Sequence, residues 1–182
     1  MIKCKMTRFS STLVASLLIL LTFISCGGKK KKVSIPYVNY ESGAASNTGT
    51  IDVPFKLESG VKYVQVKING LSTDMVFDTG CSTTLISVLE AQQLVKRGLL
   101  SKEDFLGTTE AIIADGSVVE DAVFNIRTLE LTDGNRTIVC RNVLTQVSSN
   151  AEAPVLLGNG VLDRVASYTI DNDARVIRFK LK

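Results

Sequence analysis

Residues 64–87 read VQVKINGLSTDMVFDTGCSTTLIS and form the most informative stretch of this sequence. In its first part apolar residues alternate with polar ones, as in a strand with one buried face. The pair Asn69-Gly70 is a strong signal for a tight hairpin turn. A second strand therefore runs into Asp78-Thr79-Gly80 and carries the Asp78 carboxyl group at its end.

Asp-Thr-Gly after an apolar strand is suited to holding an acid rigidly. Gly80 lets the backbone turn closely, and the hydroxyl group of Thr79 can lock the loop. Alone the triplet is a weak signal, because an aspartate before glycine is also common in ordinary turns. The rest of the chain must decide between catalysis and a turn.

Further signals downstream indicate a mainly β domain. Ser87 and Glu90 form a capping box, which predicts a helix of about ten residues that stops at Gly98. Asp115-Gly116 predicts a two-residue hairpin turn, and residues 133–135 predict another turn. The tail 168–182 reads as strand, turn and strand, after a short helical turn near residues 160–164. We expect a small closed sheet or barrel with one clear helix.

Three ordered motifs together carry a family resemblance. They are the stretch 64–87, the hairpin AIIADGSVVEDAVF at 111–124 and the segment PVLLGNGVL at 154–162. In this order they resemble the retropepsin-like aspartic proteases, and the bacterial single-lobed members more than the viral enzymes. The resemblance covers roughly residues 51–182 and implies a retropepsin-like closed barrel.

The resemblance also implies roles for particular residues. Asp78 would be the catalytic carboxylate, with Thr79 and Gly80 completing its loop. Residues on the substrate side would be Ser82 together with Asp115 and Gly116 in the flap hairpin. The residues that support the loop from beneath would be Leu156, Leu157 and Gly158. No cofactor and no metal is implied.

Aspartic proteolysis needs two carboxylates that share a proton, so that one activates water while the other protonates the carbonyl oxygen. The sequence contains only one Asp-Thr-Gly and is too short for a second lobe. Two copies must therefore bring their Asp78 residues together across a twofold axis. By resemblance, the segments near Ile51 and at 176–181 would help to build the sheet of the homodimer.

Composition excludes several other classes of protein. The chain has no histidine, which rules out Ser-His-Asp and Cys-His hydrolases and histidine-based metalloproteases. It has no Cys-x-x-Cys pair, which argues against a structural zinc site. Nothing resembles a basic stripe with interleaved aromatic residues, so we expect no nucleic-acid partner.

The first 25 residues have the pattern of a signal peptide: cations at Lys3, Lys5 and Arg8, then an apolar run too short to span a membrane comfortably. FISC at 23–26 resembles the lipobox of bacterial lipoproteins, which implies that Cys26 is lipidated and becomes the first residue of the mature chain. The alternatives are an ordinary secreted protein and an uncleaved anchor. Residues 26–50 would be a lysine-rich flexible linker, and residues 51–182 the protease domain.

Removing residues 1–25 removes three cations and no acid, so 21 Lys+Arg against 18 Asp+Glu becomes 18 against 18. Lys29 to Lys32 would lie beside the lipid, against anionic headgroups or as a solvated spacer. Gly27 rather than Asp follows Cys26, so we expect an outer-membrane anchor that faces the periplasm.

Only Cys81 and Cys140 remain for the domain, and sequence alone does not establish whether they form a disulfide. Cys81 stands where Ala or Ser is usual in the resembled family, either as an oxidation-sensitive thiol or as a small buried hydrophobe. Two functions follow from the sequence. The first is an envelope-anchored dimeric aspartic endopeptidase, and the alternative is a catalytically silent lipoprotein of the same fold that binds peptides or assists assembly.

Overall fold

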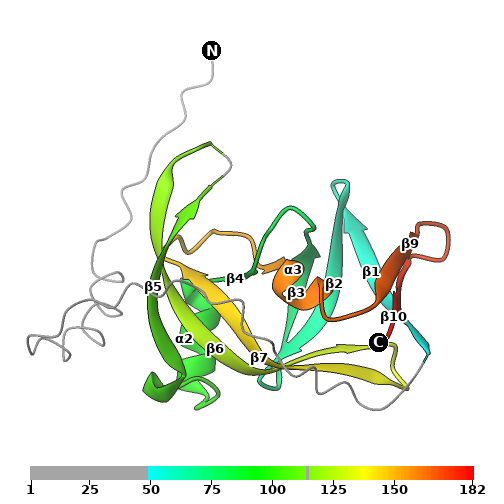
Figure 1. The fold of residues 1–182 in the computed structure, drawn as a ribbon, viewed down its shortest axis with the longest axis horizontal. Coiled ribbons are helices and arrows are strands. Elements are labelled where there is room, and N and C mark those ends of the chain that lie inside the picture. The colour runs from blue at the N-terminus through cyan, green and yellow to red at the C-terminus, as the bar shows by residue number, and fades with distance from the viewer. Residues whose placement is uncertain (1–48, 114) are drawn as a thin grey trace, which may run out of the picture. The chain divides into compact units, whose positions relative to one another are not determined.

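Ten strands form one sheet in the computed structural model, which describes residues 49–113 and 115–182. The strand order is β5-β6-β7-β4-β8-β3-β2-β1-β10-β9, and β6 pairs additionally with β2. That pairing closes β6, β7, β4, β8, β3 and β2 into a ring (Figure 1). The prediction of a mainly β, closed architecture with one clear helix is confirmed.

The elements alternate with short turns along the chain. In order they are β1 (Thr50–Glu58), β2 (Val61–Ile68), β3 (Leu71–Phe77), β4 (Thr84–Ser87), α2 (Val88–Lys96), η1 (Lys102–Asp104), β5 (Phe105–Ile112), β6 (Val118–Thr132), β7 (Thr137–Ser148), β8 (Leu156–Leu157), α3 (Asn159–Leu162), β9 (Ser167–Asp171) and β10 (Val176–Lys180).

The hairpin β2–β3 forms as the sequence predicts. Its turn residues Asn69 and Gly70 both have positive φ, 48° and 90°, which the tight primed turn requires. Val64 and Met75 face each other across the pair and are fully buried. The hairpin thereby fixes the register of β3, whose last residue precedes Asp78.

Helix α2 begins with the predicted capping box. The Ser87 hydroxyl accepts a hydrogen bond from the Leu89 amide at 3.1 Å, and the Glu90 carboxylate accepts one from the Ser87 amide at 3.0 Å. Gly98, with φ of 68°, follows its end as expected. Ala91 and Leu94 join the hydrophobic core, so the helix packs with its apolar face inward.

The hairpin β5–β6 also forms, but its turn is longer than predicted. β5 ends at Ile112 and β6 begins at Val118, whereas the pair Asp115-Gly116 alone would make a two-residue loop. The Ile113 amide donates to the Ser117 carbonyl at 3.0 Å and the Gly116 amide donates to the Ile113 carbonyl at 2.8 Å, so the turn is closed between Ile113 and Ser117. The Asp115 carboxylate accepts a hydrogen bond from the Ser117 amide at 2.8 Å.

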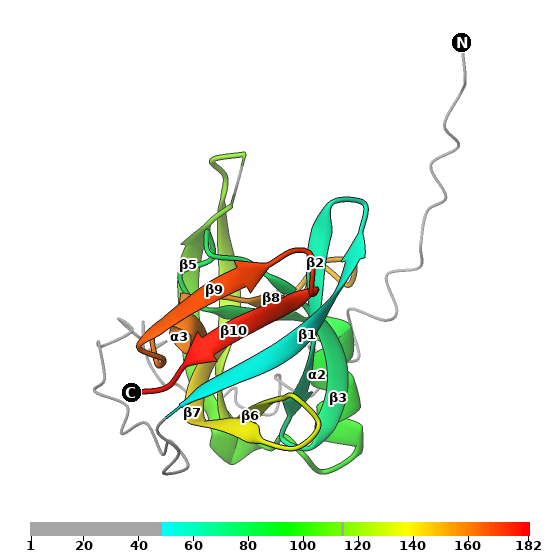
Figure 2. The ribbon, with the colours of Figure 1, turned by 90° about the vertical axis from the view of Figure 1, so that its right-hand side faces the viewer.

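The C-terminal strands pair within one chain. β10 lies between β1 and β9 and is hydrogen-bonded to both, so neither edge of it is open to a partner (Figure 2). Thr50 pairs with Lys180, and the Leu181 amide donates to the Gly49 carbonyl at 3.0 Å. The segments near Ile51 and at 176–181 therefore pair with each other inside one chain. The strand left at this edge of the sheet is β9.

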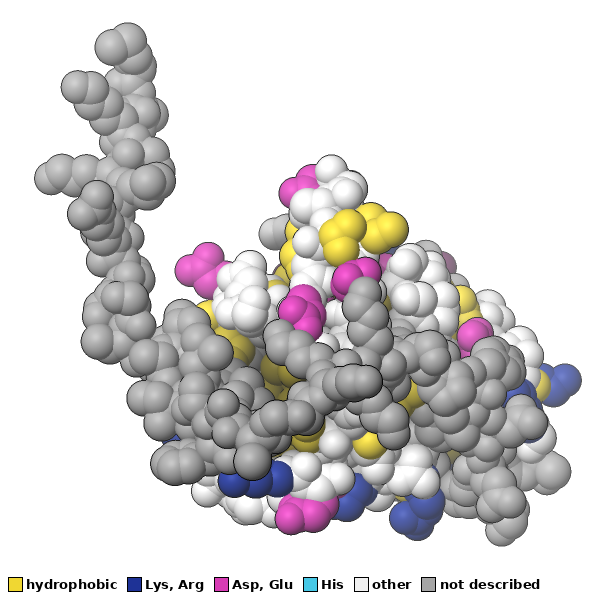
Figure 3. Space-filling model, turned by 60° about the vertical axis from the view of Figure 1, so that its left-hand side comes forward, with side chains coloured by type: hydrophobic (Ala, Val, Ile, Leu, Met, Phe, Trp, Pro, Cys, Tyr) yellow, Lys and Arg dark blue, Asp and Glu magenta, His cyan; other side chains and the backbone are white. Residues whose placement is uncertain are grey.

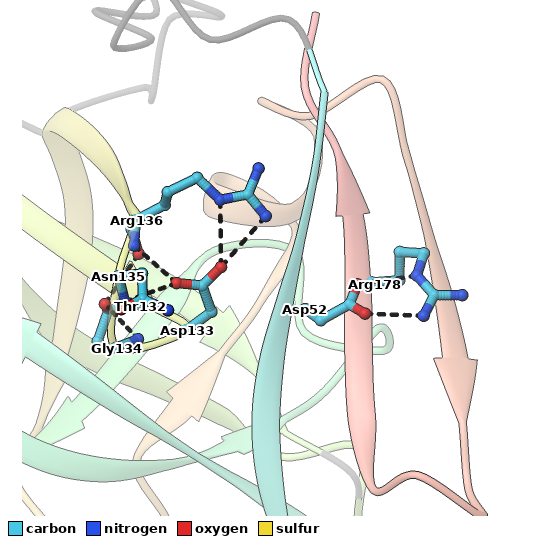
Figure 4. A network of polar contacts seen from close by, with 7 residues as sticks. All are labelled: Asp52, Thr132, Asp133, Gly134, Asn135, Arg136 and Arg178. Carbon is cyan, nitrogen blue, oxygen red and sulfur yellow. Dashed lines mark hydrogen bonds and ion pairs between the residues drawn. The ribbon is translucent and has the colours of Figure 1, made fainter.

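Two clusters of hydrogen-bonded polar side chains lie near β1, β7 and β10 (Figure 4). The Arg178 side chain donates two hydrogen bonds to Asp52 across the β1–β10 pair, at 2.8 and 2.7 Å, and these hold the pKa of Asp52 below its ordinary value. In the β6–β7 turn, Asp133 accepts hydrogen bonds from the Arg136 and Asn135 amides, which lower its pKa likewise.

The predicted signal peptide at 1–25 and the predicted lipidation site Cys26 lie outside the described residues. Among the residues that the structure describes, no helix has the length and apolar character needed to cross a membrane. Cys81 and Cys140 are both free thiols, and Cys140 lies in the core as its alternating strand predicted.

Candidate active site

The loop between β3 and β4 presents Asp78 at the end of a buried strand. The side chain of Asp78 is half-buried, and Thr79 and Gly80 are exposed. The Gly80 amide donates a hydrogen bond to the Asp78 carboxylate at 2.8 Å. One carboxylate oxygen is thus held by the backbone of its own loop, and the acid has a fixed orientation. This local geometry agrees with the predicted role of Gly80.

Strand β8 holds this loop from the side. Val76 and Phe77 pair in parallel with Leu156 and Leu157, and the Asp78 amide donates to the Leu157 carbonyl at 3.2 Å. Leu157 is fully buried, while Leu156 is half-buried. The structure therefore brings the predicted supporting residues directly against the strand that carries Asp78.

Asn159 is a further residue of the loop support, and the sequence analysis missed it. Its amide donates to the Cys81 carbonyl at 2.9 Å, and its side-chain nitrogen donates to the Thr79 carbonyl at 3.1 Å. The residue joins the Asp78 loop to the first turn of α3. Its only signal in the sequence was its position directly after Leu157-Gly158.

Gly158 is required by close contact between two backbone segments. A Cβ atom at this position would lie 1.8 Å from the Thr83 carbonyl oxygen and 2.6 Å from that of Cys81. Real atoms never approach so closely, so no side chain can be accommodated without moving the loop. Gly158 thus determines how tightly the β8–α3 junction packs on the Asp78 loop.

Cys81 lies within the same loop and is partly buried. Burial raises the pKa of its thiol, and the negative charge of Asp78 raises it further. Both effects disfavour the reactive thiolate at neutral pH. The microenvironment therefore supports the small-hydrophobe interpretation over the oxidation-sensitive one.

The remaining predicted residues lie on the surface. Ser82 is exposed within the Asp78 loop, and Asp115 and Gly116 are exposed in the turn at the end of the β5–β6 hairpin. The hydrogen bond from Ser117 lowers the pKa of Asp115, so the carboxylate serves the turn itself. In Figure 1 the hairpin and the Asp78 loop both project from the upper edge of the domain.

The fold and the loop together define the class of protein, a retropepsin-like aspartic protease. The model of the family described as gag-polyprotein putative aspartyl protease matches residues 64–164, from β2 to just beyond α3. This is more than half of the sequence, and the chain belongs to that family.

Comparison with solved structures supports the same fold. A retropepsin-like aspartic protease from Rickettsia conorii aligns with a TM-score of 0.51 and 17% sequence identity. The alignment covers 76% of this chain and 94% of that one. No curated protein gives a significant match to the sequence.

Proposed function

We propose that this protein is an aspartic endopeptidase of the bacterial cell envelope that acts as a homodimer. The observation that carries the proposal is the geometry of the Asp78 loop. The Asp78 carboxylate accepts a hydrogen bond from the Gly80 amide, and hydrogen bonds with Leu157 and Asn159 hold the backbone of the loop. Such a rigid, accessible carboxylate after an apolar strand meets the positional demand of acid–base catalysis. Membership of the aspartyl protease family supports the same chemistry.

The dimer supplies the second carboxylate. One chain has one Asp-Thr-Gly, so the reaction needs Asp78 from each of two chains. When two carboxylates approach, ionisation of one raises the pKa of the other, and the pair retains a shared proton. The ionised group then takes a proton from water while the protonated one donates to the substrate carbonyl oxygen.

Two exposed surfaces of the monomer support association with a second copy of the chain. β9 is an edge strand with largely exposed side chains, so its outer backbone groups are open to a further strand. The hairpin end carries exposed apolar residues: Ile112 is 78% exposed and Val118 is 62% exposed. Exposed apolar surface of this kind is typical of a binding site.

Lipidation at Cys26 would anchor the protein, and with it the active site, to the cell envelope. The proposed anchor lies in the outer membrane and faces the periplasm. The motif FISC and the lysines that follow support it. Metabolic labelling with a lipid precursor tests this point, because wild type should be labelled and Cys26→Ser should not.

The peptidase is tested by incubating wild type and Asp78→Asn with a diverse peptide library between acidic and neutral pH. Mass spectrometry records the cleavage sites. We expect cleavage by wild type alone, with a rate per chain that rises with protein concentration until the dimer is fully formed. If neither protein cleaves any peptide although a folded dimer is present, the result would favour the catalytically silent peptide-binding module instead.

A further inference from the structure

A continuous row of side chains crosses the sheet from the Asp78 loop to the β5–β6 hairpin. Directly paired residues on neighbouring strands point to the same face of a sheet. The successive pairs are Val76 with Leu156, Leu156 with Leu85, Leu85 with Gln146, and Gln146 with Val123. The row begins two residues before Asp78 and ends in β6.

From Val76 to Gln146 this row lies on the face opposite to the hydrophobic core, whereas Val123 at its end is fully buried. The residues that alternate with it along the strands include Leu157, Ile86 and Val147, and all three belong to the core. Val76, Leu85, Gln146 and Leu156 are instead half-buried. The row is therefore the side of the sheet on which a substrate can approach Asp78.

Asp121 extends the row into the hairpin. It stands two residues before Val123 on β6 and pairs with Thr109 of β5, so the three share one face. Along this face the hairpin residues Ala111 and Val119 are also half-buried.

The opposite face of the hairpin is turned to solvent. Ile112, Val118 and Glu120 lie on it and are exposed. Figure 3 shows acidic and apolar side chains together on the projecting part of the molecule. Because Ile112, Val118 and Glu120 are exposed whereas Asp121 is buried, the face that carries Asp121 is the inner face of the hairpin.

Asp121 is a largely buried residue whose carboxyl group has no partner among the described residues, although its oxygens are not sealed from solvent. Its side chain is only 4% exposed, and no hydrogen bond or ion pair to it is formed within residues 49–113 and 115–182. The sequence from Phe105 to Ile126 contains no lysine or arginine. The next cation, Arg127, already binds Asp104 at 3.0 Å. Burial raises the pKa of Asp121, as expected for a carboxylate that lacks a neutralising group.

We propose that Asp121 is a specificity-determining residue that selects peptides with a lysine or arginine side chain near the cleaved bond. The inference rests on the proposed peptidase and names the class of substrate for that site. A basic side chain laid along the row would supply the cation that the buried carboxylate lacks, in a charge-assisted hydrogen bond. A neutral side chain of similar length would leave the carboxylate unpaired.

The geometry limits where this basic residue stands. Strands are about 4.8 Å apart, so the four steps from Val76 to Val123 span about 19 Å along the sheet. An extended peptide rises about 3.3 Å per residue, which places the selected residue within about six positions of the cleaved bond. Because the dimer has two copies of Asp121, the selection applies on either side of that bond.

The test uses the full chain in detergent as wild type, Asp121→Asn and Glu120→Gln. The last variant is the matched control, because it removes one negative charge from the exposed face of the same strand. Asp121→Asn preserves the shape of the side chain and removes a buried charge, and circular dichroism verifies its fold. Cleavage of a peptide library is compared between the three proteins by mass spectrometry.

We expect wild type and Glu120→Gln to cleave peptides with Lys or Arg at one such position about tenfold faster than peptides with Met there, in kcat/KM. Asp121→Asn should reduce that ratio to about twofold or less. The same preference in Asp121→Asn as in wild type, or no basic preference in wild type, would overturn the proposal.

A binding experiment separates this inference from the peptidase itself. Asp78→Asn and the double variant Asp78→Asn/Asp121→Asn are immobilised and used to select peptides from the same library. If no protein cleaves but Asp78→Asn retains basic peptides more than the double variant does, the peptidase fails and the selectivity of Asp121 stands. Equal retention of basic and neutral peptides by Asp78→Asn refutes the selectivity.

Discussion

A Cβ atom at Gly158 would lie 1.8 Å from the carbonyl oxygen of Thr83. Backbone atoms, not a flexible side chain, occupy that space, so the conflict cannot be relieved by a rotamer change. The β8–α3 junction and the Asp78 loop are therefore packed together at a distance that only glycine permits.

Gly158→Ala should consequently destabilise the domain by about 3 kcal/mol or more, because the loop must move away from β8. Gly160→Ala is the matched control within α3, since its Cβ would meet neighbours only at ordinary contact distance, 3.6 Å. That variant should change stability by about 1 kcal/mol at most and in the favourable direction. Urea unfolding measures both, and equal stabilities would contradict the prediction.

Asp121→Asn should stabilise the domain at neutral pH but not at acidic pH. Burial raises the pKa of Asp121 in the folded state above that in the unfolded chain. The folded state then binds the proton more tightly, so stability is lost as the pH rises above the ordinary aspartate value. Asparagine carries no charge, so the Asp121→Asn variant does not lose stability in this way as the pH rises.

Urea unfolding measured from acidic to neutral pH tests the effect. The free energy of unfolding of Asp121→Asn should exceed that of wild type at neutral pH, and the difference should shrink towards acidic pH. Glu120→Gln is the control for the loss of one negative charge from the exposed face of the same strand. A penalty from Asp121→Asn at neutral pH would show that the carboxylate has a structural partner.

Asp104 and Arg127 form an ion pair of which the acid is buried and the base is half-exposed. The Asp104 side chain is 7% exposed and also accepts the Ser101 amide at 2.9 Å. Arg127→Met would leave this carboxylate without its cation and should cost about 2 kcal/mol in the free energy of unfolding. Arg141→Met, at an exposed arginine of β7, should change it by less than about 0.5 kcal/mol. Similar effects of the two variants would show that the pair is unimportant.

Cys81 should react slowly with iodoacetamide at neutral pH, because burial and Asp78 raise its thiol pKa. The control is an exposed thiol in the same loop, made as Ser82→Cys in a Cys81→Ala background. We expect the control to react at least about fivefold faster, as followed by mass spectrometry of the loop peptide. Equal rates would revive the interpretation of Cys81 as a reactive thiol.

Local chemistry explains which features the sequence could predict. Asn69-Gly70 and the Ser87–Glu90 capping box depend on residues close together in the chain, and both formed as expected. The Asp115-Gly116 pair predicted a hairpin correctly but too short a turn, because the Ile113 amide donates to the Ser117 carbonyl and so closes a longer loop.

Features that depend on distant parts of the chain were not predictable. The Asn159 side chain donates a hydrogen bond to Thr79, which lies 80 residues away in the sequence, and the residues around Asn159 contain no pattern that predicts this contact. The alternating pattern of β6 marks Asp121 as an ordinary polar position, because burial by the inner face of the hairpin appears only in the fold. The pairing of β1 with β10 also joins residues far apart in the chain, so it could not be read from the local pattern.

The contact between the two ends of the domain has a consequence for its architecture. Gly49 accepts the Leu181 amide at 3.0 Å, and Thr50 pairs with Lys180. Adjacent ends of the domain allow circular permutation, in which a linker joins residue 181 to residue 49 and the domain is opened elsewhere. A permutant opened in the exposed turn at Gly116 should keep the closed ring of strands, since the ring depends on strand pairing and not on the order of strands in the chain. It would also cut the hairpin that carries Asp121, and so test whether the ring of strands folds independently of that hairpin.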